Sequence, residues 1–520
     1  MKDVEKPTSN PSPTNIILLY NIMTLKNTSC SFLGVTTKLM LYLIFFSFIF
    51  YLIYSLKLFY PLVLLHDTNN YSSSSPFFGR KLESNSANSS ETVAKSGSSG
   101  GGEITGLQHI VFGIAASSNI WNHRKNYIKL WWEPKKMRGF VWLDKIVKTY
   151  NDDLETLPPL MVSNDTSKFR YKNKDGDRSA IRLTRIVSET LRLGLEDVRW
   201  IVMGDDDTFF VAENLVRVLK KYDHKQFYYI GANSESHLQD IRFSYNMAYG
   251  GGGFAISFPL AKALAKIQDE CIERYPELYG SDDRVQACLS ELGVPVTKEI
   301  GFHQFDLFGN VFGILAAHPV TPLVSLHHLD VIMSIFPNLN QFQSLHLLKQ
   351  PMELDSAALM QQSICYDKAR NWTISVSWGY AVQILRGVIL PREMELPVRT
   401  FTDWYRKADE TAFAFNTRPF HKNTCLRPSV FTLYSADMHG SSSNQTVSRY
   451  GKYRNPGYKC KWKMPDPDQI RQVEVYKKPN PFLWNKSPRR NCCRVLHSGK
   501  QHILQVDVDE CREGEIIGVN

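Results

Sequence analysis

The stretch RWIVMGDDDTFF, residues 199–210, joins a short apolar run to three successive carboxylates. The apolar part, Trp200–Met203, is typical of a fully buried strand in an α/β sheet. A helix-like segment with apolar side chains at helical spacing follows at Ala212–Tyr222. In open α/β sheets, ligands bind where the strands end at their carboxyl edge. The stretch therefore predicts a ligand site at Asp205, Asp206 and Asp207.

The three acids have two explanations. Neighbouring carboxylates repel one another unless a positive charge lies among them. Their oxygen atoms suit Mg²⁺ or Mn²⁺, which usually bind through one or two carboxylates together with substrate phosphates. The alternative is an acidic turn that caps the next helix, where negative charge is also favourable. Because the acids alone fit both explanations, the rest of the chain has to choose between them.

Strand and helix patterns alternate around this stretch. We expect strands at residues 109–116, 140–144 and 227–231, and helices at residues 121–132 and 178–193. Such alternation implies a largely parallel sheet with right-handed crossovers, and hence the α/β class.

Two later motifs add candidate chemistry. Gly250–Gly253 precede an apolar run that ends at Ser257, and glycine lets a ligand approach the backbone closely. A flexible turn explains the glycines equally well. Asp282 and Asp283 stand at the start of a helical pattern, where N-terminal capping accounts for one acid but does not require two.

The N-terminal region predicts a membrane anchor. Leu39–Leu56 has no charged residue and reaches the length of a membrane-spanning helix. Lysines before the segment slightly outnumber the basic residues that follow it, which favours a cytoplasmic N-terminus. We therefore predict a cytoplasmic tail at residues 1–38, a signal anchor at 39–60 and a flexible Ser- and Gly-rich stem at 61–105. This is the organisation of a single-pass type II membrane protein.

Cysteines and sequons agree with a luminal position for the rest of the chain. Of the 9 cysteines only Cys30 precedes the anchor, and the others predict disulfides if they face an oxidising lumen. The adjacent Cys492 and Cys493 are expected to pair with different partners. Asn27 forms one N-x-S/T sequon before the anchor, and the sequons after it begin at Asn70, Asn88, Asn164, Asn371, Asn444 and Asn485.

Composition excludes some functions. Hydrophobic residues make up 43% of the chain and charged residues 22%, which is ordinary for a folded protein. The net charge of +10 is spread out without a long basic run, so nucleic acid is not indicated as a partner. An acidic or phosphorylated small ligand fits the same balance. Because no C-x-x-C pair occurs, a structural zinc site of the usual kind is not expected.

Residues 107–330 resemble glycosyltransferase family 31, in particular the fringe-related β-1,3-glycosyltransferases. The sequence looks most similar to the plant branch of fringe-like proteins, known for a domain of unassigned function. The resemblance implies a GT-A, Rossmann-like fold and inverting transfer from a UDP-sugar to a glycan or glycoprotein hydroxyl in the Golgi lumen. The motifs that carry it keep the family's order: His109–Ala116, Phe140–Asp144, Trp200–Phe210, Tyr249–Ser257, Ser281–Val285 and Pro322–Asp330.

The resemblance also implies a metal site. The family's D-x-D motif maps onto Asp205 and Asp207, with Asp207 as the direct Mn²⁺ (or similar cation) ligand and Asp205 in ribose or water contacts. A histidine after the last core strand completes the site, and His327 and His328 both fit, with His303 as a third option. The bound cation would stabilise charge on the departing UDP.

Other site residues follow from the same resemblance. Inversion needs a base opposite the leaving UDP, and the family's acidic pair makes Asp283 the expected base, with Asp282 supporting it or binding acceptor. Gly251 and Gly252 would line the cleft for donor sugar and acceptor. Positions expected to face the nucleotide are Ala115, Ala116, Arg124, Asp144, Asp205 and Asp206.

Two departures from the family and two alternative functions qualify this assignment. Ala255 stands where fringe proteins have a cysteine, which unsettles transferred disulfide pairings, and Ser281 replaces a proline, which unsettles donor or acceptor choice. One alternative is a catalytically inactive, fringe-like glycan-binding or scaffold protein of the Golgi. The other, a metal-dependent phosphohydrolase, would need more histidine and aspartate ligands for two metals. We expect the GT-A domain at residues 106–394 and a small, β-rich, disulfide-stapled appendage at 395–520.

Overall fold

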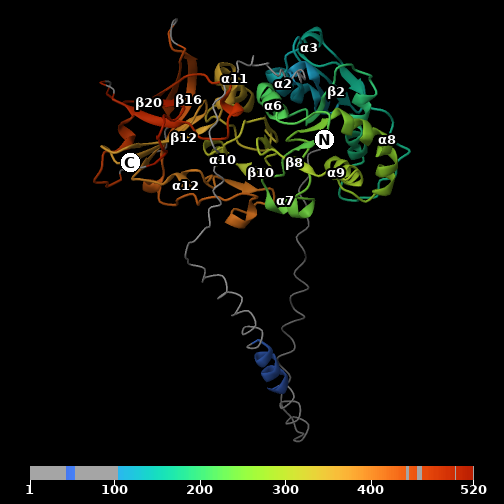
Figure 1. Ribbon diagram of the computed structural model, residues 1–520, viewed down its shortest axis with the longest axis horizontal. Helices are drawn as coiled ribbons and strands as arrows, with labels where there is room; N and C mark the ends of the chain where they lie inside the picture. The colour runs from blue at the N-terminus through green and yellow to red at the C-terminus, as the bar shows by residue number, and fades with distance from the viewer. Residues whose placement is uncertain are drawn as a thin grey trace, which may run out of the picture. The chain divides into compact units, whose positions relative to one another are not determined.

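A computed structural model of the chain describes residues 42–52, 104–440, 444–453, 460–497, 499 and 501–518 (Figure 1). It divides into two compact units, of which the larger comprises Gly102–Asn520 and the smaller Lys2–Gly101. In the smaller unit the structure describes one helix, over residues 42–52. Among the helices of the described residues, none is long and apolar enough to cross a membrane. The predicted tail, the remainder of the predicted anchor and nearly all of the predicted stem lie outside the described residues.

The larger unit contains a seven-stranded sheet, as the alternating pattern predicts. Its strand order is β3-β2-β1-β4-β7-β6-β8. Neighbouring strands are parallel except around β7, which is antiparallel to both β4 and β6. The α/β class expected from the sequence is therefore confirmed. The strands are β1 (Ile110–Ala115), β2 (Arg138–Leu143), β3 (Leu160–Val162), β4 (Trp200–Asp205), β6 (Tyr229–Gly231), β7 (Phe254–Ser257) and β8 (Val296–Lys298).

Helices cover both faces of this sheet, because alternate residues of the central strands point to opposite sides. Phe112 of β1 and Val202 of β4 pack with α2 and α6 in one apolar cluster. Ile201 and Met203 of β4 pack with α5, α8 and α9 in another. The helix predicted at 178–193 is two short helices that meet at Arg185. The helices here are α2 (Trp121–Trp131), α3 (Asn151–Thr156), α4 (Ser179–Thr184), α5 (Ile186–Leu191), α6 (Ala212–Leu219), α7 (His237–Arg242), α8 (Phe258–Arg274) and α9 (Ser281–Glu291), with a 3-10 turn at Leu107–His109.

Two small sheets extend the α/β part beside the end of β4. One has the order β5-β11-β9, with β5 at Phe209–Phe210, β9 at Phe302–His303 and β11 at Ser325–Leu326. The other pairs β10 (Leu307–Gly309) with β15 (Phe401–Asp403). Because β5 directly follows the acid triplet and pairs with β11, it brings the residues after Leu326 next to the acids.

An eight-stranded sheet forms the rest of the unit, in the order β12-β13-β14-β16-β17-β18-β20-β19. All neighbours are antiparallel except β18 and β20. The disulfide Cys365–Cys493 joins its first strand to its last, so the sheet curls back on itself. The strands are β12 (Gln362–Asp367), β13 (Trp372–Ser377), β14 (Ala381–Arg386), β16 (Ser429–Met438), β17 (Thr446–Lys452), β18 (Gln472–Lys477), β19 (Cys492–Leu496) and β20 (Ile503–Asp509).

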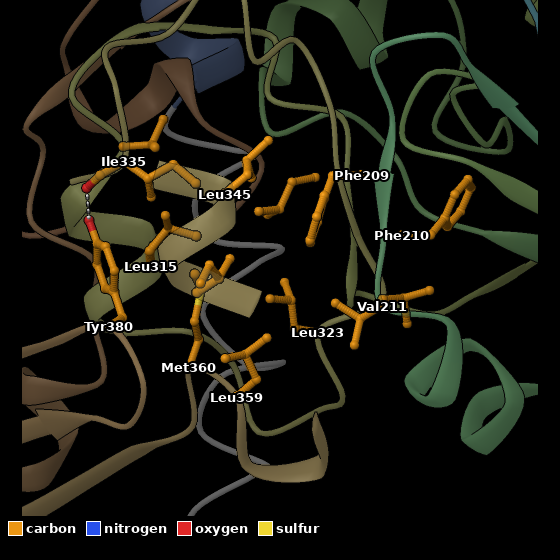
Figure 2. Packing of buried hydrophobic residues seen from close by; sticks show 14 of the residues in the cluster. Phe209, Phe210, Val211, Leu315, Leu323, Ile335, Leu345, Leu359, Met360 and Tyr380 are labelled. Atoms are coloured by element: carbon orange, nitrogen blue, oxygen red, sulfur yellow. Dashed lines mark hydrogen bonds between the residues drawn. The ribbon is translucent and has the colours of Figure 1, made fainter. Parts of the chain in front are cut away.

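This sheet differs from the appendage expected at 395–520. It begins at Gln362, so the boundary placed at residue 394 runs through one sheet rather than between two domains. A continuous apolar cluster also links it to the α/β part (Figure 2). In that cluster Val211 and Leu323 pack with Leu359 and Met360, and the Tyr380 hydroxyl donates to the Ile335 carbonyl at 3.2 Å. The remaining elements are α10 (Phe312–Ala316), α11 (Gln341–Asp355), α12 (Pro391–Met394) and 3-10 turns at Ser356–Ala358, Glu410–Ala412, Thr424–Leu426, Pro467–Gln469 and Leu483–Asn485.

All eight cysteines after the predicted anchor form disulfides, as expected for an oxidising compartment. Cys492 and Cys493 pair with different partners, which confirms that prediction. The pairs are Cys271–Cys288, Cys365–Cys493, Cys425–Cys460 and Cys492–Cys511.

Candidate metal and nucleotide-sugar site

The acid triplet forms a tight, buried turn at the carboxyl end of β4. Asp205 is the last residue of β4 and pairs with Ala115 of β1, so both strands end at the same level. The Asp205 amide donates to the Thr208 hydroxyl at 2.8 Å, and that hydroxyl donates to the Gly251 carbonyl at 2.7 Å. The exposed fractions of Asp205, Asp206 and Asp207 are 8%, 2% and 0%. The turn thus holds three carboxylates inside the protein, where each is costly unless it is neutralised.

The acids point to two different partners. Asp206 accepts hydrogen bonds from the Ser117 amide and from Arg124 Nη1, both at 3.3 Å, and so faces the loop after β1. Asp205 and Asp207 face His327, which follows β11 directly. The turn therefore directs the first and third acids toward His327 and the second toward the loop after β1.

Asp205, Asp207 and His327 meet the requirements of a metal site. His327 Nε2 lies 3.5 Å from Asp205 Oδ2 and 3.2 Å from Asp207 Oδ1. One ligand atom from each residue fits within 4.8 Å of the others. Among the described residues, neither oxygen of Asp207 nor Nε2 of His327 has a hydrogen-bond partner, although all three atoms are buried. Two carboxylates and an imidazole suit Mn²⁺ or a similar divalent ion. Asp207 Oδ2 has no partner among the described residues, whereas Asp207 Oδ1 lies within ion-pair distance of both His327 Nε2 and Arg124 Nη1.

The neighbouring imidazoles have other roles. His327 Nδ1 lies 3.3 Å from the Gln304 carbonyl, a contact that orients the ring and leaves Nε2 for a ligand. His328 adopts φ +53°, turns its Nδ1 toward Asp306 Oδ1 at 3.1 Å and stacks on Trp404. The structure therefore brings His327, and not His328, to the acids. The third option, His303, contacts Glu235 and His318 instead.

Arg124 lies among the carboxylates rather than along an open nucleotide edge. Its Nη1 is 2.6 Å from Asp207 Oδ1, and its Nε is 3.0 Å from Asp330 Oδ2. Burial alone would lower the pKa of Arg124, but Asp207, Asp206 and Asp330 raise it above its ordinary value. Tyr127 also donates its hydroxyl to Asp330. Arg124 therefore supplies part of the positive charge that the acid triplet requires.

Burial and mutual repulsion shift the pKa values of the acids. Burial, with repulsion from Asp207 and Asp282, raises the pKa of Asp205 to about 8. Burial and Asp207 likewise raise the pKa of Asp206 to about 6. Burial would also raise the pKa of Asp207, but His327 and Arg124 lower it below its ordinary value. The cluster is thus short of positive charge, and a divalent cation would relieve that deficit.

The glycine run packs against the site. A Cβ on Gly251 would come within 2.0 Å of the His327 ring, and a Cβ on Gly250 within 2.6 Å of Asp282 Oδ1. The Gly252 amide donates to Gln304 Oε1 at 2.6 Å. Glycine is required here because the backbone approaches the metal-site histidine and an acid directly.

The paired acids at the start of α9 have unequal surroundings. Asp283 accepts the Tyr279 amide at 2.8 Å and the Gly280 amide at 3.0 Å, so it caps the helix. Asp282 accepts from the Ser281 hydroxyl at 3.1 Å and lies against Gly250 of the glycine run. Burial raises the pKa of Asp282 to about 6. Asp282 is therefore the acid that adjoins the metal site.

The predicted nucleotide edge is formed by the ends of β1 and β2. Ala115 is buried in β1, and the Ala116 carbonyl accepts Arg182 Nη2 at 3.0 Å. Arg182 Nη1 donates to the Trp142 carbonyl at 3.0 Å, so this arginine joins the two strand ends. Asp144 accepts the Ser118 amide at 2.7 Å and its hydroxyl at 2.9 Å, and these bonds lower its pKa against the opposing effect of burial. Arg182 was not identified from the sequence. The one sequence feature that could have indicated its role is a charged residue on the buried face of the predicted helix at 178–193.

Two family descriptions match the chain and overlap. The Fringe-like family matches residues 105–312, and the family "Protein of unknown function, DUF604" matches residues 239–493. This chain is a fringe-related protein with a DUF604 domain. Asp205 and Asp207 come from the Fringe-like region alone and His327 from the DUF604 region alone. The two matched regions of this fringe-related protein therefore build one site.

Curated relatives of this fringe-related protein include two β-1,3-glucosyltransferases. The chain is 28% identical to the one from Mus musculus over 159 residues, which is 31% of this chain and 30% of the relative. It is 29% identical to the one from Homo sapiens over 119 residues, which is 23% of each chain. It thus spans less than a third of the length of either relative. Among solved structures, one titled as the active-site mutant Q189E of LgtC is 12% identical with a TM-score of 0.27, covering 46% of this chain and 82% of that one.

Proposed function

We propose that this fringe-related protein is an inverting, metal-dependent glycosyltransferase that moves a sugar from a UDP-sugar to a hydroxyl of a glycan or glycoprotein. The β-1,3 linkage is proposed from the names of the curated relatives and the family resemblance. The observation that carries the proposal is the buried cluster of Asp205, Asp207 and His327, in which the Asp207 oxygens and His327 Nε2 form no hydrogen bond with the described residues. Such a cluster at the carboxyl end of a central strand is where α/β proteins bind phosphorylated ligands.

Donor binding would use the loops after β1 and β4. The carboxylates of Asp205 and Asp207 and the imidazole of His327 would hold Mn²⁺ or a similar ion. The bound cation would neutralise the donor pyrophosphate and the charge that develops on departing UDP. The Ser117 amide and Arg124, which now contact Asp206, lie beside this position and can contribute donors to phosphate or ribose oxygens. Arg182 fixes the strand ends that shape the nucleotide edge.

Acceptor activation would use the start of α9. The family resemblance assigns the base to Asp283, but both of its oxygens accept backbone amides in this structure. Asp282 lies beside the glycine run, and its pKa of about 6 leaves it mostly ionised at neutral pH, as a base requires. We therefore place Asp282 at the acceptor hydroxyl and Asp283 behind it, holding the helix start.

The cellular setting is also part of the proposal. The uncharged segment Leu39–Leu56 and the sequons favour a Golgi signal anchor with a luminal catalytic region. The sequon residues within the described parts of the chain, Asn164, Asn371, Asn444 and Asn485, are all exposed, as glycan attachment requires. The disulfides agree with an oxidising compartment.

UDP release by the full-length chain, purified in detergent, tests the proposal across a panel of UDP-sugars, glycan acceptors and Mn²⁺ concentrations. We expect acceptor-stimulated UDP release with one donor, and its loss in Asp207→Ala and His327→Gln. His328→Gln is the matched control, because it removes the adjacent imidazole without removing a proposed ligand; it should keep at least about a tenth of the activity. Mn²⁺-dependent UDP binding without turnover on any acceptor would instead favour the glycan-binding or scaffold alternative. Metal-independent turnover would contradict the proposal.

A further inference from the structure

A cavity of about 900 Å³ lies outside the metal site, on the outward face of the eight-stranded sheet. Its floor includes Gln383 and Leu385 of β14 and Val430 and Thr432 of β16. Gln383 is paired with Val430 across the two strands, and the intervening residues of both strands point into the apolar core on the other face. The volume is within the range of about 300–1,000 Å³ that is usual for small-molecule sites.

The lining of the cavity combines apolar and cationic side chains. Aromatic and aliphatic groups dominate it, among them Phe312, Ile335, Leu396, Phe420 and Trp462. Its arginines are Arg386, Arg399, Arg418 and Arg427, against a single acid, Glu393. The wall therefore offers an apolar surface together with an excess of positive charge.

Two of these arginines form no ion pair with a carboxylate in the described part of the chain. Arg386 contacts Asp466 at 2.6 Å and Arg399 contacts Glu410 at 3.6 Å. Arg418 and Arg427 instead donate Nε to the Leu396 and His421 carbonyls, at 3.1 and 2.8 Å. Among the described residues, no carboxylate forms an ion pair with either of them. Burial lowers the pKa of Arg418, and the nearby charge of Glu393 opposes that shift.

A buried polar group on the floor gives an independent sign of a ligand. Gln383 is only 4% exposed, and within the described part of the chain its Oε1 has no hydrogen-bond partner. A buried carbonyl oxygen without a partner is unfavourable, and a bound hydroxyl or N–H group would satisfy it. Gln383 belongs to the same sheet face as Val430, so this polar atom lies beside apolar surface.

We propose that this cavity binds a small amphipathic anion, with an apolar or aromatic body over the sheet floor, a hydroxyl or N–H group toward Gln383 Oε1, and a carboxylate or phosphate head paired with Arg418 and Arg427. Guanidinium groups bind such heads by charge-assisted hydrogen bonds. The two guanidinium groups make a purely apolar ligand unfavourable. The apolar floor makes a free inorganic anion unfavourable as the main ligand. This cavity is distinct from the proposed sugar-transfer site, but β15 runs between the two. Arg399, which precedes β15, lines the cavity, and Trp404, which follows β15, stacks on His328.

Binding of fluorinated biphenyl probes to the full-length chain, followed by ¹⁹F NMR against detergent blanks, tests this proposal. The probes are 4′-trifluoromethyl-biphenyl-4-carboxylate, its neutral carboxamide and the corresponding phosphate monoester. We expect saturable binding of the carboxylate, with the carboxamide about tenfold weaker or more, because it lacks the charge-assisted contacts. Tighter binding of the phosphate ester than of the carboxylate would identify phosphate as the preferred head, and the reverse would identify carboxylate.

Variants separate the site from general surface attraction. The double variant Arg418→Gln/Arg427→Gln should weaken the carboxylate about tenfold and leave the carboxamide unchanged. Arg392→Gln removes one positive charge from an exposed position on α12 outside the cavity, so binding should change less than about twofold. Arg418→Lys/Arg427→Lys keeps both positive charges and should retain most of the affinity even if the Gln variant misfolds. Equal binding of acid and amide, an equal loss in Arg392→Gln, or no binding above the blank would overturn the proposal.

Discussion

Two groups of buried charged residues in the described part of the chain differ in how far their charges are paired. In the eight-stranded sheet, Lys477 of β18 contacts Asp355 of α11 at 2.5 Å, and the same carboxylate accepts the Asn480 amide at 3.0 Å. Lys477 also donates to the Lys478 carbonyl at 2.8 Å. Among the described residues only Oδ1 of Asp355 is left without a hydrogen bond in this group.

The acid triplet is the opposite case. There, three buried acids share one arginine and one imidazole, and both oxygens of Asp207 and Nε2 of His327 lack hydrogen-bond partners within the described chain. A buried ion pair whose charges and hydrogen bonds are matched within the protein connects elements of the fold. A buried cluster with unmatched charges and hydrogen-bonding atoms is a candidate ligand site. The comparison predicts that substitutions in the two places separate stability from activity.

The largest effect is expected at Asp207. Asp207→Asn should reduce turnover about a thousandfold or more, since a metal ligand is lost while the shape is kept. Saturating Mn²⁺ should raise the unfolding free energy of the wild-type chain by about 2.7 kcal/mol at a hundred times Kd, and should leave Asp207→Asn unchanged. Thermal unfolding with and without Mn²⁺ measures this, and Mg²⁺-free buffer with chelator is the baseline. A full Mn²⁺ shift in the variant would show that the metal binds elsewhere.

The two acids of α9 sharpen the comparison within the site itself. Asp282→Asn should lower kcat about 10²–10⁴-fold, as loss of a general base does, with little change in UDP affinity. Asp283→Asn should instead cost about 1 kcal/mol of unfolding free energy, as loss of a helix cap does, and should keep most of kcat. Steady-state kinetics and urea unfolding of both variants distinguish these roles. If the two kinetic results are exchanged, Asp283 is the base and its cap contacts open in the complex.

The satisfied pair predicts a loss of stability without a loss of chemistry. Lys477→Met leaves the Asp355 carboxylate buried without its cation and should cost about 3–5 kcal/mol. The activity per folded molecule should be unchanged, because the pair contacts no site residue. The matched double variant Lys477→Met/Asp355→Leu removes both charges and should recover most of the loss, as seen in chemical unfolding. A double variant as unstable as the single one would mean that the Lys478 and Asn480 contacts, and not the ion pair, hold these elements.

The sequence predicted those features of the site that depend on residues close together in the chain. Asp205 and Asp207 were predictable because an apolar strand and its terminal acids are one local signal. His327 and His328 were indistinguishable, since only the pairing of β11 with β5 and the positive φ of His328 decide which ring turns to the acids. Asp282 and Asp283 were both located, but the cap contacts that separate their roles depend on the backbone turn at Tyr279 and Gly280.

Features that depend on contacts between residues far apart in the sequence could not be predicted from the hydrophobic pattern. Arg182 joins two strand ends, β1 and β2, that lie far from it in sequence, and its helix shows only ordinary apolar spacing. The C-terminal boundary was misplaced because no local signal in β12–β14 shows which sheet these strands join. Their membership in the later sheet depends on the pairing of β14 with β16 and on the Cys365–Cys493 bridge, and cysteine connectivity cannot be deduced from sequence.

A third buried group, formed by the titratable residues Glu235, His303 and His318, gives the smallest effect. His318 Nδ1 is 2.8 Å from the Pro319 carbonyl and must donate to it, so His318 Nε2 accepts from His303 Nε2 at 3.0 Å. Neutral His303 then has a bare Nδ1 facing Glu235 Oε1 at 2.9 Å, and a protonated Glu235 supplies the missing proton. Burial raises the pKa of Glu235 to about 8 and lowers that of His303 to about 4, in agreement with this arrangement.

The sign of the pH effect follows from the raised pKa of Glu235. The unfolded chain releases this proton near its ordinary pKa of about 4.5, whereas the folded chain keeps it until about pH 8. The contribution is therefore complete below pH 4.5 and is lost as the pH rises to 8. Glu235→Gln keeps a donor toward His303 and an acceptor for the Phe305 amide, but it does not titrate. Its unfolding free energy should fall less steeply than that of the wild type between pH 5 and 8, by about 1 kcal/mol or more over the window. Equal slopes in urea unfolding would mean that Glu235 is ionised and His303 carries the proton, which would make this group a satisfied ion pair like Lys477 and Asp355.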